Sequence, residues 1–574
     1  FGVDNTALGH LSLYSNNNGA ENVACGKNAL YSNVDGSYNS ALGMEALYSN
    51  SNGIRNTAVG YRALYSNTSG TYNVAVGSLA LNLNSSGIEN VSIGRSSSYK
   101  NTTGYENIAI GKEALYENTT YYRNIAIGTY ALQKNTANDN IAVGVYALRY
   151  NTTGGSNTAY GYSASRDNTT GGYNTAIGYN ALLENETGQH NIAVGYNTLA
   201  STSTTGSYNT AIGSNNLRFN TSGEKNTCIG TSSLYSNTSG IGNTALGFEA
   251  CKSNSYGSYN IAIGYQSFAS PSSNGSNNIA IGYQTLNYNE SGGLNIAIGY
   301  KSLFKNMYSG STIGIGSFAL YSHIGGAHNI AIGDSSLYFG AANNDNLAIG
   351  FAALKNNDDG DYNMAIGTQA LYKNLYGNSN VALGNFAGKN IMYGSSNTAV
   401  GDSALFGGTD GYGDNNTAIG NAALYKNSGD RNTSIGYGSS KNITTGDDNV
   451  SIGFNAGPSG GTTATTVAIG NGAVTGNMCV SVGHNATCSS TRSVTMGYGA
   501  SAFFRSVSIG YSASAFANYS TALGSEASAS YDNSTSIGYG TTTSVANQMH
   551  FGNTSVSSIQ GQVGFTTYSD SRVK

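Results

Sequence analysis

Asparagine is the residue type whose spacing most clearly permits chemistry in this 574-residue chain. Asn-x-Ser/Thr sequons recur along it, and in a secreted protein their side-chain amides accept N-linked glycans on exposed loops. Asn-Thr-Thr-Gly is also a favourable turn sequence without any glycan, and the sequence leaves both interpretations open. Ten candidates share one repeat position: Asn67, Asn84, Asn101, Asn118, Asn151, Asn168, Asn185, Asn220, Asn237 and Asn289.

Other residue types that support chemistry are few and scattered. The six histidines form no metal-binding pattern with cysteine or with one another, so we interpret them as surface residues and expect no metal site. Acidic pairs such as Asp447-Asp448 lie near predicted turns, without the glycine-rich nonapeptide of calcium-binding β-rolls. A glycosidase needs two carboxylates about 5–9 Å apart in a cleft, and no insertion here is large enough to form one. We therefore expect no catalysis on an external substrate and no cofactor.

The five cysteines are too few and too scattered for a disulfide framework. Cys25, Cys228 and Cys251 take repeat positions that otherwise carry apolar or small residues, so we expect them in the core. Cys479 and Cys488 could pair within one chain or between chains, and the sequence leaves their state open.

A five-residue motif ending in glycine, such as NIAIG at 107–111, organises the chain. Its final glycine recurs 28 times from Gly9 to Gly470, and 22 of the 27 spacings are 17 residues. After Gly470 the spacing shortens to 13 or 14 residues. Repetition at a fixed period of this kind indicates an array of identical structural units.

Each unit follows the consensus N-(T/I/V)-A-(I/V/L)-G-x-x-A-L-Y-x-N-x-x-G-x-x. The β-branched segment before the first glycine predicts a strand of four or five residues, followed by an apolar Ala-Leu-Tyr piece and a turn. Seventeen residues are too few for two strands and a helix, and recurring glycines disfavour a helical repeat. We therefore predict an all-β fold, a parallel β-solenoid in which each unit forms one coil.

Stacked coils explain why only 9% of the residues are charged. Equivalent residues in successive coils would lie about 4.8 Å apart. A charge repeated in such a column costs roughly 0.9 kcal/mol per neighbouring pair even in water. Two asparagine columns avoid this cost, one opening the strand at positions such as Asn56 and one preceding the turn at positions such as Asn67. We predict that their amides form hydrogen-bonded ladders.

The alternation within I-A-I-G leaves neither face of the strand polar, and strands that are apolar on both faces are normally covered on both. One face fills the interior of the coil. We predict that the small alanine face packs closely against another chain, which makes the protein a homo-oligomer.

Several segments resemble known families. SVSIGYSASAF at 506–516 and STSIGYG at 534–540 resemble the head repeats of trimeric autotransporter adhesins, which are left-handed β-rolls. The 17-residue units, such as that at 56–72, resemble repeats of tail-fibre-domain proteins. The segment 551–574 is similar to the junction that precedes the intramolecular chaperone of endosialidase-type tailspikes. These resemblances imply a homotrimeric fibre.

The resemblance at the C-terminal junction also implies a self-cleavage step. In that family the chaperone assembles three chains and is then cut off before a serine. Carried over by position, Ser569 is the nucleophile and Lys574 its general base. This is the only catalysis that we expect.

Together these observations predict a shaft of 17-residue coils at 1–471, an adhesin-head-like β-roll at 472–542, and a neck with the cleavage junction at 543–574. The predicted function is an extracellular fibre or adhesin shaft on a cell or virion surface, with self-association and a surface glycan or protein receptor as its partners. The alternatives are a phage or virus tail fibre that recognises host glycans and a subunit of an end-to-end filament. Scattered Lys and Arg, with a net charge of −4, argue against nucleic-acid binding, and no apolar run is long enough for membrane insertion.

Overall fold

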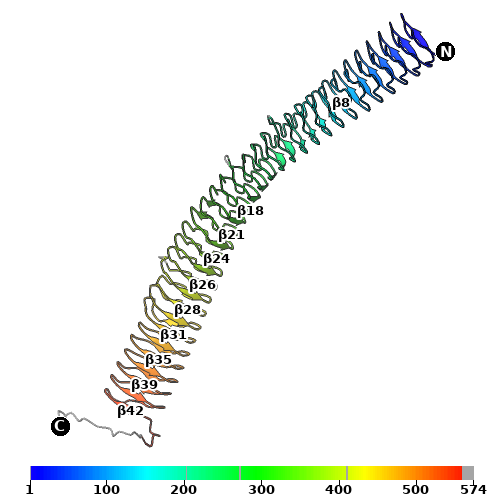
Figure 1. The fold of residues 1–574 in the computed structure, drawn as a ribbon. Helices are drawn as coiled ribbons and strands as arrows, with labels where there is room; N and C mark the ends of the chain where they lie inside the picture. The colour runs from blue at the N-terminus through cyan, green and yellow to red at the C-terminus, as the bar shows by residue number, and fades with distance from the viewer. Residues whose placement is uncertain (1, 202, 271–272, 409–410, 559–574) are drawn as a thin grey trace, which may run out of the picture. The chain divides into compact units, whose positions relative to one another are not determined.

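The computed structural model describes residues 2–201, 203–270, 273–408 and 411–558. Within these ranges it contains strands and turns and no helix. The chain forms about 32 coils of a parallel β-solenoid, which confirms the predicted fold class. It divides into two compact units, Phe1–Gly325 and Gly326–Lys574, and Figure 1 shows the stacked coils of each.

The first unit contributes one strand per coil to its main sheet, and a two-residue strand, β20, follows the last of them. The strands are β1 (Thr6–Leu8), β2 (Val23–Cys25), β3 (Ser40–Leu42), β4 (Thr57–Val59), β5 (Val74–Val76), β6 (Val91–Ile93), β7 (Ile108–Ile110), β8 (Ile125–Ile127), β9 (Ile141–Val143), β10 (Thr158–Tyr160), β11 (Thr175–Ile177), β12 (Ile192–Val194), β13 (Thr210–Ser214), β14 (Thr227–Thr231), β15 (Thr244–Leu246), β16 (Ile261–Ile263), β17 (Ile279–Ile281), β18 (Ile296–Ile298), β19 (Ile313–Ile315) and β20 (Ser322–His323).

The second unit starts with coils of the same length and keeps one main-sheet strand per coil when the shorter coils begin after Gly470. Its strands outside the second sheet are β21 (Ile330–Ile332), β22 (Phe339–Gly340), β23 (Leu347–Ile349), β24 (Met364–Ile366), β25 (Val381–Leu383), β26 (Thr398–Val400), β27 (Thr417–Ile419), β28 (Thr433–Ile435), β29 (Val450–Ile452), β31 (Val467–Ile469), β33 (Val480–Val482), β35 (Val494–Met496), β37 (Val507–Ile509), β39 (Thr521–Leu523), β41 (Thr535–Ile537) and β42 (Met549–Phe551).

Pairing between coils is parallel and joins residues at the same repeat position. Strand β4 pairs with β5, for example, so that Ala58 lies beside Ala75. Each hydrogen-bonded neighbour is thus the residue one coil further along the chain. This register confirms that like side chains lie above like, the arrangement on which the predicted columns depend.

A second, six-stranded parallel sheet begins in the last 17-residue coil and runs through the shorter coils. Their smaller circumference brings the residues after the turn into regular pairing, as between Ser501 and Ser514. The strands of this sheet are β30 (Gly457–Pro458), β32 (Val474–Thr475), β34 (Thr487–Cys488), β36 (Ser501–Ala502), β38 (Ser514–Ala515) and β40 (Ser528–Ala529).

The core of a 17-residue coil consists of alanine and leucine. Ala58, Ala63 and Leu64 are fully buried in one cluster. The Ala-Leu-Tyr piece forms turns rather than a strand, because Leu64 has a φ of 51° in the left-handed region. That conformation costs an L-residue roughly 1–2 kcal/mol. The backbone amide of Leu64 donates to the carbonyl of Ala80 in the next coil at 3.0 Å, so stacking provides a hydrogen bond for the amide of this turn.

The glycine that ends each strand is required by both conformation and space. Gly144 has a φ of 143°, and a Cβ built on it would lie 2.2 Å from the carbonyl oxygen of Gly161. We expect Gly144→Ala to lower the free energy of unfolding by at least about 1–3 kcal/mol, measured by thermal or urea unfolding. Gly155→Ala is the matched control, because its nearest neighbour would be 3.4 Å away. Equal stability of the two variants would contradict this account.

Candidate functional surfaces

The main sheet places its alanines inside the coil and its β-branched residues outside. In β11 the central Ala176 is fully buried, whereas Ile177 is 40% exposed. This corrects the prediction that the alanine face meets another chain. The interior accepts small side chains at this central position, which is Ala in most coils and the fully buried Cys228, Ser434 or Thr495 in others. The face available to a partner is therefore the β-branched one.

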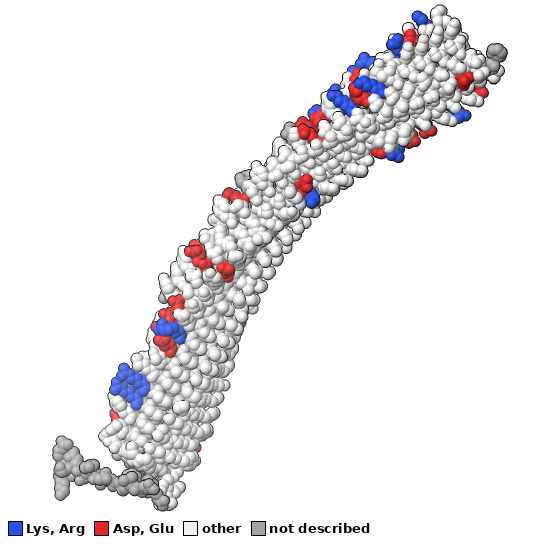
Figure 2. Space-filling model, viewed as in Figure 1, with Lys and Arg blue, Asp and Glu red and all other residues white. Residues whose placement is uncertain are grey.

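This outer face, called here the sheet face, consists of the first and third residues of each strand of the main sheet. In strands β1–β19 these positions carry only Thr, Ser, Val, Ile, Leu, Cys or Tyr, with no charged residue. A strand about 10 Å wide, repeated every 4.8 Å over 19 coils, gives an area of about 900 Å². Thr or Ser holds 8 of the 19 first positions, whereas Val, Ile or Leu holds 17 of the 19 third positions, so the apolar part of this area is a stripe along the third positions. Large areas without charge are also visible between the Lys, Arg, Asp and Glu side chains in Figure 2.

The two asparagine columns form the predicted ladders. Asn56 Nδ2 donates to Asn39 Oδ1 at 3.1 Å and to the Gly70 carbonyl at 2.8 Å, and its backbone amide also donates to Asn39 Oδ1. In the second column Asn67 Nδ2 donates to Asn50 Oδ1 at 2.7 Å. All four asparagines are fully buried. Buried amides that are bonded on both sides hold each coil to the next.

The ten glycosylation candidates all lie in this second ladder. Each is at most 1% exposed, so the exposed loops assumed for them are absent from the folded coil. Asn151 Nδ2, for example, donates to Asn135 Oδ1 and to the Gly154 carbonyl, both at 2.8 Å. The sequence Asn-x-Ser/Thr fits a sequon and a ladder segment equally well. In the folded coil, the ladder buries the side-chain nitrogen to which a glycan would be attached.

Exposed sequons occur elsewhere. Asn442 is exposed because Ile443 takes the ladder position in that coil, and Asn485 and Asn533 are exposed in the shorter coils. If the protein is expressed in a glycosylating host, we expect glycans at these three positions and none at the ten ladder asparagines. Glycopeptide mass spectrometry of the folded protein measures both groups, and occupied ladder sites would contradict the assignment.

The shorter coils provide the link to known proteins. Two copies of the YadA head domain repeat match this chain at residues 504–527 and 519–541. They cover β37 to β41 and confirm the adhesin-like resemblance for these coils, called head repeats below. A search of curated proteins finds no match to the chain. None of the described residues belongs to a helix that is long and apolar enough to cross a bilayer.

Cys479 and Cys488, shortly before the head repeats, form a disulfide within the chain. Their Cα atoms are 6.4 Å apart, within the range that disulfides span. Cys228 and Cys251 are fully buried thiols, as predicted, and burial raises the pKa of each. Cys25 is only half-buried. A structural disulfide is typical of an oxidising compartment.

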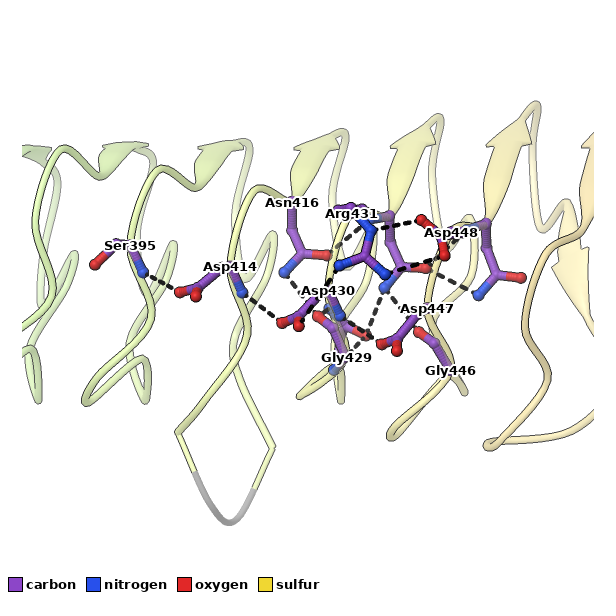
Figure 3. A network of polar contacts seen from close by, with 12 residues as sticks. Ser395, Asp414, Asn416, Gly429, Asp430, Arg431, Gly446, Asp447 and Asp448 are labelled. Carbon is purple, nitrogen blue, oxygen red and sulfur yellow. Dashed lines mark hydrogen bonds and ion pairs between the residues drawn. The ribbon is translucent and has the colours of Figure 1, made fainter.

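Carboxylates replace the amide or hydroxyl in one short column of the second unit (Figure 3). Oxygens of Asp414, Asp430 and Asp447 each accept the backbone amide of the preceding coil, at 2.7–2.8 Å. The hydrogen bond from Arg431 lowers the pKa of Asp448. This exposed ion pair therefore stabilises the fold above the unfolded carboxyl's pKa and is lost as the pH falls through the lowered value.

The remaining candidate residues are placed as follows. His323 is fully buried, so the expectation that all histidines lie at the surface is wrong for this one. Among the residues in the described ranges, no three His, Cys, Asp or Glu side chains are arranged to hold a metal ion. Ser569 and Lys574 lie outside the described residues, so their predicted roles stay predictions.

Proposed function

We propose that this protein is the structural shaft of an extracellular fibre that attaches to a surface, and that three chains associate through their sheet faces. The observation that carries the proposal is the uncharged sheet face with its column of outward aliphatic side chains. Its estimated 900 Å² in the first unit alone exceeds the roughly 800 Å² that each partner buries in a stable complex. The head repeats and the internal disulfide support an adhesin-like, extracellular setting.

The proposed role is mechanical and multivalent rather than catalytic. Each coil presents nearly the same outer residues, so a bound surface meets many equivalent positions on one fibre. Linked weak contacts raise the overall affinity far above that of one contact. Self-cleavage by Ser569 and Lys574 at the C-terminal junction is retained as part of the proposal.

Mass measurement tests the association directly. We expect three chains of 59.1 kDa, about 177 kDa, by light scattering or native mass spectrometry of the unaltered protein. A stable species of 59.1 kDa at micromolar concentration would overturn the proposed fibre. Electron microscopy of the same sample separates single fibres from end-to-end filaments, because only filaments lengthen with concentration.

A further inference from the structure

A column that usually carries tyrosine holds the same positive charge in two consecutive coils of the first unit, which opposes the preference of stacked positions for uncharged residues. The fifth residue after the strand-ending glycine is tyrosine in coils such as those of Tyr48 and Tyr65. In two consecutive coils this position holds Arg149 and Arg166. Like charges about 4.8 Å apart repel one another, so this substitution of two arginines opposes stacking.

The two arginines differ in how they are neutralised. Arg166 Nε donates to Asp167 Oδ1 at 2.9 Å, and Glu184 lies at 4.0 Å. Arg149 has no carboxylate within ion-pair distance among the described residues, and its Nε donates only to the neutral Gln133 Oε1 at 2.9 Å. A guanidinium has five N–H donors, so most of those on Arg149 are available to a ligand.

Aromatic rings surround the Arg149 guanidinium. Its central carbon lies 5.0 Å from the ring centroid of Tyr130, 5.2 Å from that of Tyr146 and 4.8 Å from that of Tyr150. These contacts hold the cation in place through the ring faces without neutralising its charge. Arg149 is thus a positioned cation that lacks an anion.

A groove of about 370 Å³ opens beside this cation. It exists because Ser163 takes the column position that Tyr146 occupies in the preceding coil, and a serine leaves the space of the ring empty. Tyr162 and Tyr179 form one wall, with their rings stacked on each other at 5.3 Å. Tyr179 also stacks on Tyr196 at 5.6 Å, so the nearly half-exposed side chains of this wall present their ring edges to the groove. The volume lies within the range of small-ligand sites.

We propose that this groove binds an acidic glycan segment, with sugar hydroxyls at the exposed ring edges of Tyr162 and Tyr179 and a carboxylate or sulfate on Arg149. The phenol hydroxyls at the exposed ring edges can hydrogen-bond to sugar hydroxyls, and a guanidinium pairs with a planar carboxylate or a sulfate through two hydrogen bonds. A neutral sugar would leave Arg149 without its partner. Asp167 already neutralises Arg166, so the groove offers one net positive charge rather than the basic surface that nucleic acid needs.

This inference deepens the proposed function by naming a ligand class, and it rests on that function only for its biological setting. Its test is calorimetric titration of the full chain with trigalacturonate and with the trimethyl ester of trigalacturonate, which has the same ring framework and no charge. A sulfated trisaccharide distinguishes sulfate from carboxylate recognition, and triglutamate tests an acidic peptide. We expect binding of one or both anionic sugars, and at least about tenfold weaker binding of the ester.

Two variants locate the site. Arg149→Gln is expected to weaken binding of the anionic sugar at least about tenfold, and Tyr179→Ala to weaken it by a smaller factor. Arg505→Gln is the matched control, because Arg505 also lies over two rings, those of Phe504 and Tyr519, outside this groove. Circular dichroism and thermal unfolding confirm that each variant is folded.

The proposal is overturned if no anionic sugar binds, if the ester binds equally well, if triglutamate binds as tightly as the sugars, or if Arg149→Gln has no effect. Chain number is measured on the same samples by native mass spectrometry. If a monomer binds the sugar, the proposed trimer is overturned and the proposed groove site is retained. If a trimer forms but binds no sugar, the groove site is overturned and the trimer is retained.

Discussion

The double variant Ile212→Lys, Ile229→Lys is expected to migrate as a single chain of 59.1 kDa, whereas the unaltered protein migrates as a trimer. The two residues lie on the sheet face in β13 and β14, paired in register and 38% and 44% exposed. In a closed interface the two lysines of each chain would lose water beside one another. The effective penalty is several kcal/mol per buried ion, before any repulsion between chains.

The control keeps the number of lysines and moves them off the sheet face. Tyr256 and Tyr308 are large, 65% and 60% exposed, and lie in bends outside the strands. We expect Tyr256→Lys, Tyr308→Lys to remain trimeric by light scattering across the same concentrations. Unchanged association of the isoleucine variant would show that the sheet face is not the interface, whereas dissociation of both variants would indicate a nonspecific effect of charge.

Repeat spacing predicted the fold because every coil imposes the same restrictions on its neighbours. The strand at Ile108–Ile110 and the ladder position of Asn67 follow directly from residues that recur every 17 positions. The alternation of residues along the strand could not show which face of the sheet lies inside the coil. A repeat of two residues indicates only that the alanine face and the β-branched face point in opposite directions. The structure decides it: the central Ala109 of Ile108–Ile110 is buried in the coil, and the isoleucines on either side of it face outward.

The binding surfaces were less accessible to sequence reasoning for a related reason. Asn151 satisfies the sequon and the ladder equally well, so only its burial separates the two interpretations. The groove beside Arg149 comes from a local change in two columns, tyrosine to arginine and tyrosine to serine. Aligning the chain in rows of one coil would have shown both changes, but not that Asp167 neutralises only one of the two arginines.

Asn50→Asp is expected to lower the free energy of unfolding by about 3–5 kcal/mol at neutral pH. Asn50 is fully buried, and its Nδ2 donates to Asn33 Oδ1 at 2.8 Å and to the Gly53 carbonyl at 3.0 Å. An aspartate here would place a carboxylate oxygen, in place of the amide nitrogen, against Asn33 Oδ1 and the Gly53 carbonyl oxygen. It would also bury a negative charge. Thermal unfolding measures the loss, and hydrogen exchange should place it in the coils around residue 50, because stability in a stacked array is set by nearest neighbours.

Asn52→Asp, two residues along the same coil, makes the identical chemical change at an exposed position. We expect it to change stability by less than about 0.5 kcal/mol. Burial raises the pKa of the carboxyl introduced at position 50 above its unfolded value, so its destabilisation should diminish as the pH falls through that raised value. The protonated carboxylic acid at position 50 carries no charge, and its hydroxyl restores one hydrogen-bond donor. If both variants lost the same stability at every pH, the buried amide ladder would not be what holds successive coils together.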